Sequence, residues 1–241
     1  MKMTNQKEYL IYGGNKMNLL SIDTTTKKAS VSLKKDNTLS TKTVDNEITH
    51  SEKLLPIIDL ALKENNLALE NIDKYLILNG PGSFTGIRIS LATLKAFSQV
   101  YKKDIFSISS LEALAYLGYK KTNSKYIVSF IDAKNDRVYF CIYKIETENQ
   151  KVIITSLTDI QNEYLDDAKD FITAFIKENN IHAYSSIGNI SDVDITTYPS
   201  TEDLIEIYEN VDTKKHTFDY YSLNAVYARA SQAERVKNGE N

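Results

Sequence analysis

Three glycines between an apolar run and a long helical pattern constrain the fold of this chain more than any other feature. They stand in the stretch Gly80-Pro81-Gly82-Ser83-Phe84-Thr85-Gly86-Ile87-Arg88. The apolar run 75–78 precedes the stretch and an unbroken helical pattern over 87–101 follows it. A strand, a glycine turn and a helix start in this order can form an anion-binding loop, because N–H groups at the helix N-terminus face the loop and glycine permits close approach.

The loop lacks the side chains of a Walker phosphate loop. Such a loop has Lys and then Ser or Thr directly after its last glycine, whereas Gly86 is followed by Ile87 and Arg88. We therefore favour a tight turn that packs a helix closely against a sheet. An anion site at the loop stays open as the alternative.

The bulk composition is that of a soluble globular protein. The chain has 241 residues, of which 42% are apolar and 25% charged, enough for one large domain or two modest ones. No run approaches the ~18 apolar residues of a membrane helix, and no signal-peptide core is present, so we expect a cytoplasmic protein without membrane contact. A net charge of −3 disfavours strong nucleic-acid binding by this chain alone.

The order of the predicted elements repeats once along the chain. The first copy comprises strands 18–22, 29–34 and 38–44, helix 50–66, strand 75–79 and helix 85–101. The second comprises strands 126–131, 137–143 and 152–157, helix 166–178, strand 183–187 and helix 201–210. The predicted fold class is therefore α/β, with two duplicated β-β-β-α-β-α lobes.

The lobes are expected to be joined by a crossover helix. The strand 105–108 ends the first lobe, and Ser109-Ser110-Leu111-Glu112 is a capping box that starts a helix running to about residue 117. The predicted division is an N-terminal extension at 1–16, a first lobe at 17–108, the crossover helix and second lobe at 109–235, and a tail at 236–241. The polar extension could come from a start codon assigned too early.

The glycine motif, continued by Ile89 and Leu91-Ala92-Thr93, resembles the signature of the bacterial TsaB family. Further segments resemble the family in the expected order: Ile22-Asp23-Thr24-Thr25-Thr26, His50-Ser51-Glu52-Lys53-Leu54-Leu55-Pro56, Ser109-Ser110-Leu111-Glu112-Ala113-Leu114-Ala115, Asp132-Ala133-Lys134, Arg137-Val138-Tyr139, Val226-Tyr227-Ala228-Arg229 and Ala233-Glu234. The resemblance extends from Met17 to about Arg235. It is specific in the first half and weak over 144–220.

The resemblance implies a fold of the actin/Hsp70/sugar-kinase type, which agrees with the repeat. It also implies a non-catalytic role in making threonylcarbamoyladenosine, the modified base beside the anticodon of certain tRNAs. In this role the chain would bind and support the catalytic subunit TsaD, with the ATPase TsaE joining them. The chain would reach tRNA only through that complex, and would form a homodimer when alone.

The phosphate loops of kinases with this fold are not retained. Such a loop has an Asp, then a glycine and a hydroxyl residue, but Asp23 is followed by Thr24-Thr25-Thr26 and Asp132 by Ala133-Lys134. We interpret Asp23, Thr24 and Asp132 as vestigial phosphate-loop positions in Asx-type turns, and predict weak or no ATP binding and no cofactor. The alternative is a small-molecule or sugar kinase in which Asp23 holds a metal and loop 80–86 lies under phosphate.

Neither a metal site nor a nucleophile is predicted. His50 is followed four residues later by Leu54 where a metal-binding helix would have a second His, and His182 and His216 have no ligand partner nearby in sequence. The segment 82–86 does not match a nucleophile elbow, so a peptidase interpretation has no support and no catalytic residue is nominated. The single cysteine, Cys141, lies in an alternating apolar run and is expected to be a core thiol.

The helices 50–66 and 85–101 are apolar or small almost all round. Each has one narrow polar stripe, formed by Glu52, Asp59, Lys63 and Asn66 in the first and by Arg88, Lys95 and Gln99 in the second. Such helices must be buried on more than one side, either within the chain or against a partner. The family resemblance favours a helical seam with TsaD or a second copy, with candidate residues His50, Leu54, Leu55, Ile58, Leu62, Ile89 and Leu94.

Arg88 is an unexpected residue in the first turn of a helix. A cation there opposes the helix dipole by about 0.3–1 kcal/mol when exposed. We therefore expect a compensating contact, either with a carboxylate elsewhere in the chain or with an acidic partner or anion near the loop.

Overall fold

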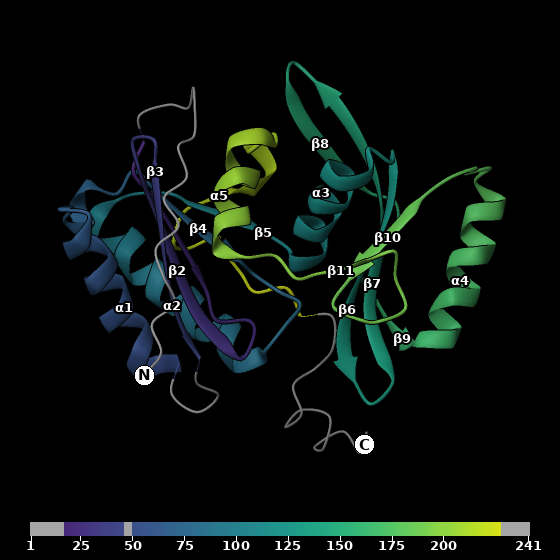
Figure 1. The fold of residues 1–241 in the computed structure, drawn as a ribbon, viewed down its shortest axis with the longest axis horizontal. Coiled ribbons are helices and arrows are strands. Elements are labelled where there is room, and N and C mark those ends of the chain that lie inside the picture. Colours follow the sequence, from purple (N-terminus) through teal and green to yellow (C-terminus); the bar gives the residue numbers. More distant parts are fainter. Residues whose placement is uncertain (1–16, 46–49, 228–241) are drawn as a thin grey trace.

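The computed structural model describes residues 17–45 and 50–227, which form two β-sheets side by side with helices between and outside them (Figure 1). The predicted extension 1–16, the motif residues beyond Tyr227 and the tail 236–241 lie outside the described residues. Among the residues that are described, no helix is long and apolar enough to cross a membrane.

The first sheet has the strand order β12-β5-β4-β1-β2-β3. Strands β1, β2 and β3 pair antiparallel, whereas β4 and β5 run parallel to β1. The bounds are β1 Leu19–Asp23, β2 Lys28–Lys35, β3 Thr38–Asp45, β4 Lys74–Leu78, β5 Ile105–Ile108 and β12 Thr217–Phe218. The sheet is thus completed by a short strand from near the end of the described chain.

The second sheet repeats this arrangement in the order β11-β10-β6-β7-β8, with β9 paired to β7. Strands β6, β7 and β8 are antiparallel, and β10 and β11 run parallel to β6. The bounds are β6 Tyr126–Lys134, β7 Arg137–Glu148, β8 Lys151–Ser156, β9 Gln161–Tyr164, β10 Ser185–Gly188 and β11 Ile195–Thr196. The same order and directions in both sheets confirm the predicted α/β class and the duplicated lobes.

Each sheet is covered by helices from both copies of the repeat. Helices α1 (His50–Glu64) and α2 (Phe84–Tyr101) cover the outer face of the first sheet, and α4 (Leu165–Glu178) covers the outer face of the second (Figure 1). Between the sheets, α3 (Ser110–Thr122) follows the first-copy strands but packs on the second sheet, whereas α5 (Thr201–Asn210) follows the second-copy strands but packs on the first. This exchange ties the two halves of the fold together.

The alternating side chains of the first sheet separate two cores. Leu19, Leu76 and Leu78 pack into the central core with α3 and α5. Leu20 and Ile77 point the other way, into the core under α1 and α2. A third core lies between the second sheet and α4. Because period-2 alternation places successive residues on opposite faces, both faces of the first sheet are buried.

A buried ion pair adds to this central packing. Lys34 on β2 is 0% exposed and pairs with Glu209 on α5. Close by, the Ser32 and Thr201 hydroxyls are 2.7 Å apart, again between β2 and α5. A buried ammonium needs such a carboxylate, because an unpaired charge in a core is costly.

The predicted helices and most predicted strands are confirmed with small shifts at their ends. The elements that the sequence patterns did not indicate are β9, β11, β12 and the short 3-10 helices η1 (Leu69–Asn71) and η2 (Lys214–His216). These segments are two to four residues long. Such a length is too short for a periodic pattern, so only their pairing in the folded chain defines them.

Candidate functional site

The glycine loop connects β4 to α2 and packs against the turn between β1 and β2. Ser83 is the N-cap of α2, and its Oγ accepts a hydrogen bond from the Gly86 N–H at 3.2 Å. The Ser83 N–H donates to the Thr25 carbonyl oxygen at 2.9 Å. Two N–H groups that could have faced an anion are therefore already bonded within the chain.

Each glycine of the loop permits a close approach of main chain. A Cβ on Gly86 would lie 1.6 Å from the Thr24 carbonyl oxygen. A Cβ on Gly80, which has φ +107°, would lie 2.6 Å from the Val226 carbonyl oxygen, and one on Gly82 would lie 3.0 Å from the Thr25 Cβ. A side chain cannot fit at Gly80 or Gly86, where backbones meet at such distances, and at Gly82 it would need a small shift of Thr25, so the close packing predicted for this loop is confirmed. Pro81, between the first two glycines, is also buried.

Thr24, which the sequence predicted to be a vestigial phosphate-loop position, takes part in this packing. Its buried hydroxyl donates to the Gly86 carbonyl oxygen at 2.6 Å and lies 2.5 Å from the Ser90 Oγ. Asp23 accepts hydrogen bonds at Oδ1 from the Thr25 N–H at 2.9 Å and the Thr25 hydroxyl at 2.6 Å. This is the Asx-type turn expected at the end of the strand.

Asp132 forms the corresponding turn in the second lobe. Its Oδ1 accepts from the Lys134 N–H at 2.8 Å, and its carboxylate pairs with the Lys134 ammonium. Partial burial raises the pKa of the Asp132 carboxyl, but the hydrogen bonds from Lys134 outweigh burial and hold that pKa below its usual value. The Asp132 N–H donates to the Asn189 Oδ1 at 2.7 Å.

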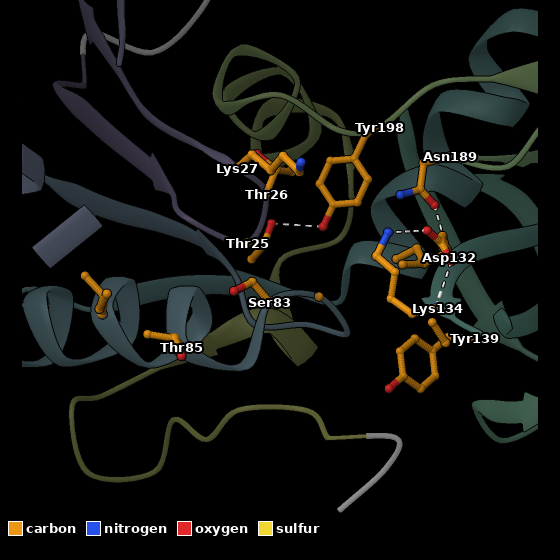
Figure 2. Close-up of a pocket in the computed structure, with 14 residues that line it drawn as sticks. Thr25, Thr26, Lys27, Ser83, Thr85, Asp132, Lys134, Tyr139, Asn189 and Tyr198 are labelled. Atoms are coloured by element: carbon orange, nitrogen blue, oxygen red, sulfur yellow. Dashed lines mark hydrogen bonds and ion pairs between the residues drawn. The ribbon is translucent and has the colours of Figure 1, made fainter. Parts of the chain in front are cut away.

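A cleft of about 700 Å³ lies between these two turns and the start of α2. Figure 2 shows Thr25, Thr26 and Lys27 on one side, Asp132 and Lys134 on the other, and Ser83 and Thr85 below them. The structure thus brings the first-lobe turn, the second-lobe turn and the glycine loop together around one space. Asp23 itself is buried beneath the turn and does not line the cleft.

Tyr198 stands in this cleft and connects the lobes. Its Oη is 2.9 Å from the Thr25 Oγ1 and donates to the Ser110 Oγ at 3.4 Å. Burial raises the pKa of the Tyr198 hydroxyl, and the nearby Asp23 carboxylate raises it further, so the ring is a neutral donor at pH 7. Sequence reasoning missed Tyr198, because it lies more than 170 positions from Thr25 in a segment without a motif.

The cleft offers little of what phosphate chemistry requires. The carboxylates of Asp23 and Asp132 both accept hydrogen bonds from N–H groups of their own turns. The main chain at Thr24 and Thr25 lies against the glycine loop, where phosphate would approach. Within the described residues, no group of three or more His, Cys, Asp or Glu side chains could hold a metal ion. Weak or absent ATP binding stays a prediction that titration has to test.

Four of the candidate seam residues belong to the chain's own core. Leu54, Ile58, Leu62 and Leu94 are buried among the residues beneath α1 and α2. This placement corrects the expectation that they form a surface for a partner, because the first sheet and the neighbouring helix already cover them. Ile89 is partly buried and lines the cleft. His50 opens α1, and nothing is described of its side chain.

The outer face of α1 and α2 is apolar at other positions. Leu55 on α1 is 52% exposed and Val100 on α2 is 69% exposed. Ala92 and Ala96 are also exposed, one turn apart on α2. We call Leu55, Ala92, Ala96 and Val100 the outer patch. The spacing of the two alanines is visible in the sequence, but it does not reveal which row of the helix faces outward.

Arg88 contacts aromatic rings rather than a carboxylate. Its guanidinium lies 3.9 Å from the centre of the Phe84 ring and 5.7 Å from that of the Tyr227 ring. Its Nε donates to the Tyr227 Oη at 3.0 Å. Neither expected contact, a carboxylate in the chain or an acidic partner, is needed to explain Arg88, because stacking over π faces offsets its position in the first turn.

Cys141 and His216 line a second, smaller cavity. The Cys141 thiol is buried, which raises its pKa, and donates to the Thr158 carbonyl oxygen at 3.2 Å, as expected of a core thiol. His216 has a partner that sequence spacing did not indicate, because its Nε2 lies 3.3 Å from the Glu112 Oε1 on α3. Neither residue forms a catalytic arrangement.

Comparison with known proteins gives consistent matches. The family model described as TsaD, tRNA N6-adenosine threonylcarbamoyltransferase, matches residues 45–199, more than half of the chain. The chain is 26% identical over 225 residues to the tRNA threonylcarbamoyladenosine biosynthesis protein TsaB of Haemophilus influenzae, covering 88% of this chain and 94% of that protein. It is 28% identical over 128 residues to TsaB of Escherichia coli K12, covering 53% of this chain and 55% of that protein.

Solved structures show the same fold. A crystal structure of a protein from Pseudomonas aeruginosa, described as similar to peptidase YEAZ, superposes with a TM-score of 0.68 at 21% identity. The match covers 88% of this chain and 100% of that one. The two-lobed arrangement is therefore shared over nearly the whole described chain.

Proposed function

The chain belongs to the tRNA N6-adenosine threonylcarbamoyltransferase (TsaD) family and, within it, to the TsaB proteins, and from this we propose that it is a non-catalytic subunit supporting the transferase TsaD. In this proposal the chain binds and orients TsaD during the synthesis of threonylcarbamoyladenosine in tRNA. The ATPase TsaE joins the complex, and the whole acts in the cytoplasm.

The outer patch carries the proposal. A lone subunit gains nothing by exposing Leu55 on α1 and Val100 with two alanines on α2, whereas exposed apolar side chains on a helical face are a common feature of protein interfaces. Small side chains allow a partner helix to approach closely, since the distance between packed helices depends on the residues at the contact. A contact between helix pairs would bury the patch, with charged residues such as Asp59 and Lys63 at its rim.

The chemistry of the cleft supports the same proposal. The residues at the phosphate-loop positions hold turns and join the glycine loop to the first lobe, and Tyr198 joins the first lobe to the segment before α5. Their role in this account is to fix the angle at which α2 presents the outer patch. When TsaD is absent, a second copy of the chain would cover the patch, which gives a homodimer.

Reconstitution with purified components tests the proposal. Threonylcarbamoyladenosine formed on tRNA is measured with TsaD and TsaE, with and without this chain. We expect the modification to depend on the chain. The Ala96→Arg variant should fail to support it, because a charge placed in a desolvated contact is costly. Lys177→Glu, a charge change on the exposed face of α4, serves as the control and should retain activity.

Two results would contradict this function. Full modification by TsaD and TsaE without the chain would remove the need for a supporting subunit. Rapid phosphate release from ATP by the purified chain would favour the kinase alternative, in which the cleft is a working active site.

A further inference from the structure

The segment 217–227, here called the strap, runs along the side of α2. It begins with β12, and Leu223 anchors it in the core under α1 and α2. Tyr220 lies beside Lys102 at the end of α2, and Tyr227 lies beside Arg88 at its start. The strap therefore runs opposite to α2, and the side chains of both segments share one surface.

Cations and aromatic rings alternate on this surface. The Arg88 guanidinium lies over Phe84 and near Tyr227, and the Lys102 Nζ is 5.7 Å from the centre of the Tyr220 ring. From Arg88 to Lys102 the helix rises by about 21 Å, at 1.5 Å per residue. The result is an elongated strip of rings and positive charges, which we call the aromatic strip.

Tyr221, which follows Tyr220 in the strap, is the most exposed large apolar side chain of the described residues. It is 84% exposed, although the preceding turn holds its backbone in place. The Asp219 carboxylate accepts hydrogen bonds from the N–H groups of Tyr221 at 3.0 Å and Ser222 at 2.7 Å. A fixed backbone that presents an exposed ring has no evident use in packing this chain.

The local charge is positive although the whole chain has a net charge of −3. Arg88, Lys95, Lys102 and Lys103 lie on this side of α2 or directly after it. Two carboxylates oppose these four cations: Asp104, which pairs with Lys74, and Asp219, whose pKa is held low first by the backbone hydrogen bond from Ser222, so a net positive charge is left. The strip is thus a positive surface with exposed rings.

This chemistry fits single-stranded RNA better than it fits a protein partner. Unpaired bases stack on aromatic side chains and Arg planes, while Lys and Arg contact phosphates. Protein interfaces are also rich in Tyr and Arg, but they are depleted in Lys, whereas Lys102 belongs to the strip and Lys95 and Lys103 lie near it in α2 and directly after it. The strip adjoins the outer patch, because Arg88 and Ala92 are four positions apart on α2 and are therefore neighbours on its surface.

We propose that the aromatic strip, comprising Phe84, Arg88, Lys102, Tyr220, Tyr221 and Tyr227, contacts a single-stranded segment of tRNA. Tyr221 stacks on an unpaired base, and Arg88 and Lys102 contact phosphates beside it. The inference rests on the proposed function, because the complex with TsaD brings tRNA to the chain. It adds a contact with RNA made by this chain itself.

The test measures tRNA affinity with labelled tRNA and fluorescence anisotropy, using the complex of the chain with TsaD. Tyr221→Ala should weaken binding by about five-fold or more, which is the lower end of the effect of losing one base–aromatic stack. Tyr221→Phe keeps the ring and should bind as the wild type does. Lys102→Ala should reduce the slope of log affinity against log salt by about 0.7. Tyr184→Ala, another exposed tyrosine on the second lobe, is the matched control.

Gel filtration of each variant with TsaD separates the two proposals. Weaker tRNA binding by Tyr221→Ala with normal TsaD association supports the strip as an RNA surface. Unchanged tRNA affinity, or loss of TsaD association instead, overturns it, and the second result would make the strip a protein contact. If the wild-type chain does not bind TsaD, the same variants are compared for tRNA binding by the chain alone at low salt. Equal affinities there would also overturn the inference.

Discussion

Replacement of Gly86 by Ala tests how tightly α2 is joined to the first lobe. The added methyl group would lie 1.6 Å from the Thr24 carbonyl oxygen and 2.6 Å from its carbonyl carbon. Both are backbone atoms in a turn held by Asp23 and by the Thr24 hydroxyl, so neither can move aside as a flexible side chain would. The helix and the turn must separate to admit the methyl group.

The cost follows from what the separation disrupts. Overpacking a tight contact costs about 1–3 kcal/mol. Loss of the hydrogen bonds from Thr24 Oγ1 to Gly86 O and from Ser83 N to Thr25 O adds about 1 kcal/mol each. Alanine favours a helix over glycine by about 1 kcal/mol, which offsets part of this cost. The expected loss in the free energy of unfolding is therefore about 2–4 kcal/mol.

Urea denaturation followed by circular dichroism measures this loss. The midpoint should fall while the slope of free energy against urea stays the same, since the denatured state is unchanged. Gly82→Ala is the matched control, because its methyl group would meet the Thr25 Cβ at 3.0 Å and needs only a small adjustment. If Gly86→Ala were within about 0.5 kcal/mol of the wild type, the range usual for surface substitutions, the loop would not be packed as described.

Three further predictions concern the core, the cleft and the outer patch. Glu209→Ala should cost about 3 kcal/mol or more in urea denaturation because it leaves the Lys34 ammonium buried without its carboxylate, whereas replacing both residues by Met and Leu should recover most of the loss. Burial raises the pKa of the Tyr198 hydroxyl above its ordinary value of 10.0, so the protonated form contributes stability below pH 10 that is lost as the pH rises further. Above pH 10 the free energy of unfolding should therefore fall less steeply with pH in Tyr198→Phe than in the wild type. Equal slopes in the two proteins would argue against an enclosed hydroxyl. Ile58→Arg should unfold the chain because the Ile58 side chain is buried, whereas Leu55→Arg should leave the melting temperature nearly unchanged and weaken association with TsaD. If the Ile58→Arg variant also stayed folded, the assignment of Ile58 to the core would be refuted.

The sequence predicted the lobes well because their elements are long and periodic. The strand–loop–helix unit around Gly80 and Gly86 and the repeated strand order were visible in the alternation of side chains and in the turn residues. The close packing of the glycines was favoured because the loop lacks the Lys and Ser or Thr of a phosphate loop. These features depend on residues that are close together in the sequence, so the sequence pattern is enough to predict them.

The surface of α1 and α2 could not be predicted in the same way. Both helices are apolar on several sides, so the pattern does not show which rows the first sheet covers. Leu54 and Leu55 are neighbours in sequence, yet the first is buried and the second is exposed. The difference depends on how α1 lies across β2 and β3, which is a property of the folded chain.

The contacts of Arg88 and Tyr198 depend on residues far away in the sequence. Arg88 meets Tyr227, 139 positions later, and Thr25 meets Tyr198, 173 positions later. Tyr198 lies before α5 in an irregular segment without a motif, and Tyr227 lies in the strap, in a segment whose resemblance to the family does not indicate a contact with Arg88. Sequence reasoning showed that Arg88 required a compensating contact, but only the fold identifies the aromatic rings that provide it.

Direct titration of the purified chain with TsaD tests the central claim, that this subunit acts by binding a partner through the outer patch. Calorimetry should show a single complex with the wild type, and Ala96→Arg should weaken it by at least about ten-fold, which corresponds to about 1.4 kcal/mol. The control Lys177→Glu should bind as the wild type does. Absence of a complex with the wild-type chain, or equal affinities of Ala96→Arg and the wild type, would contradict the claim.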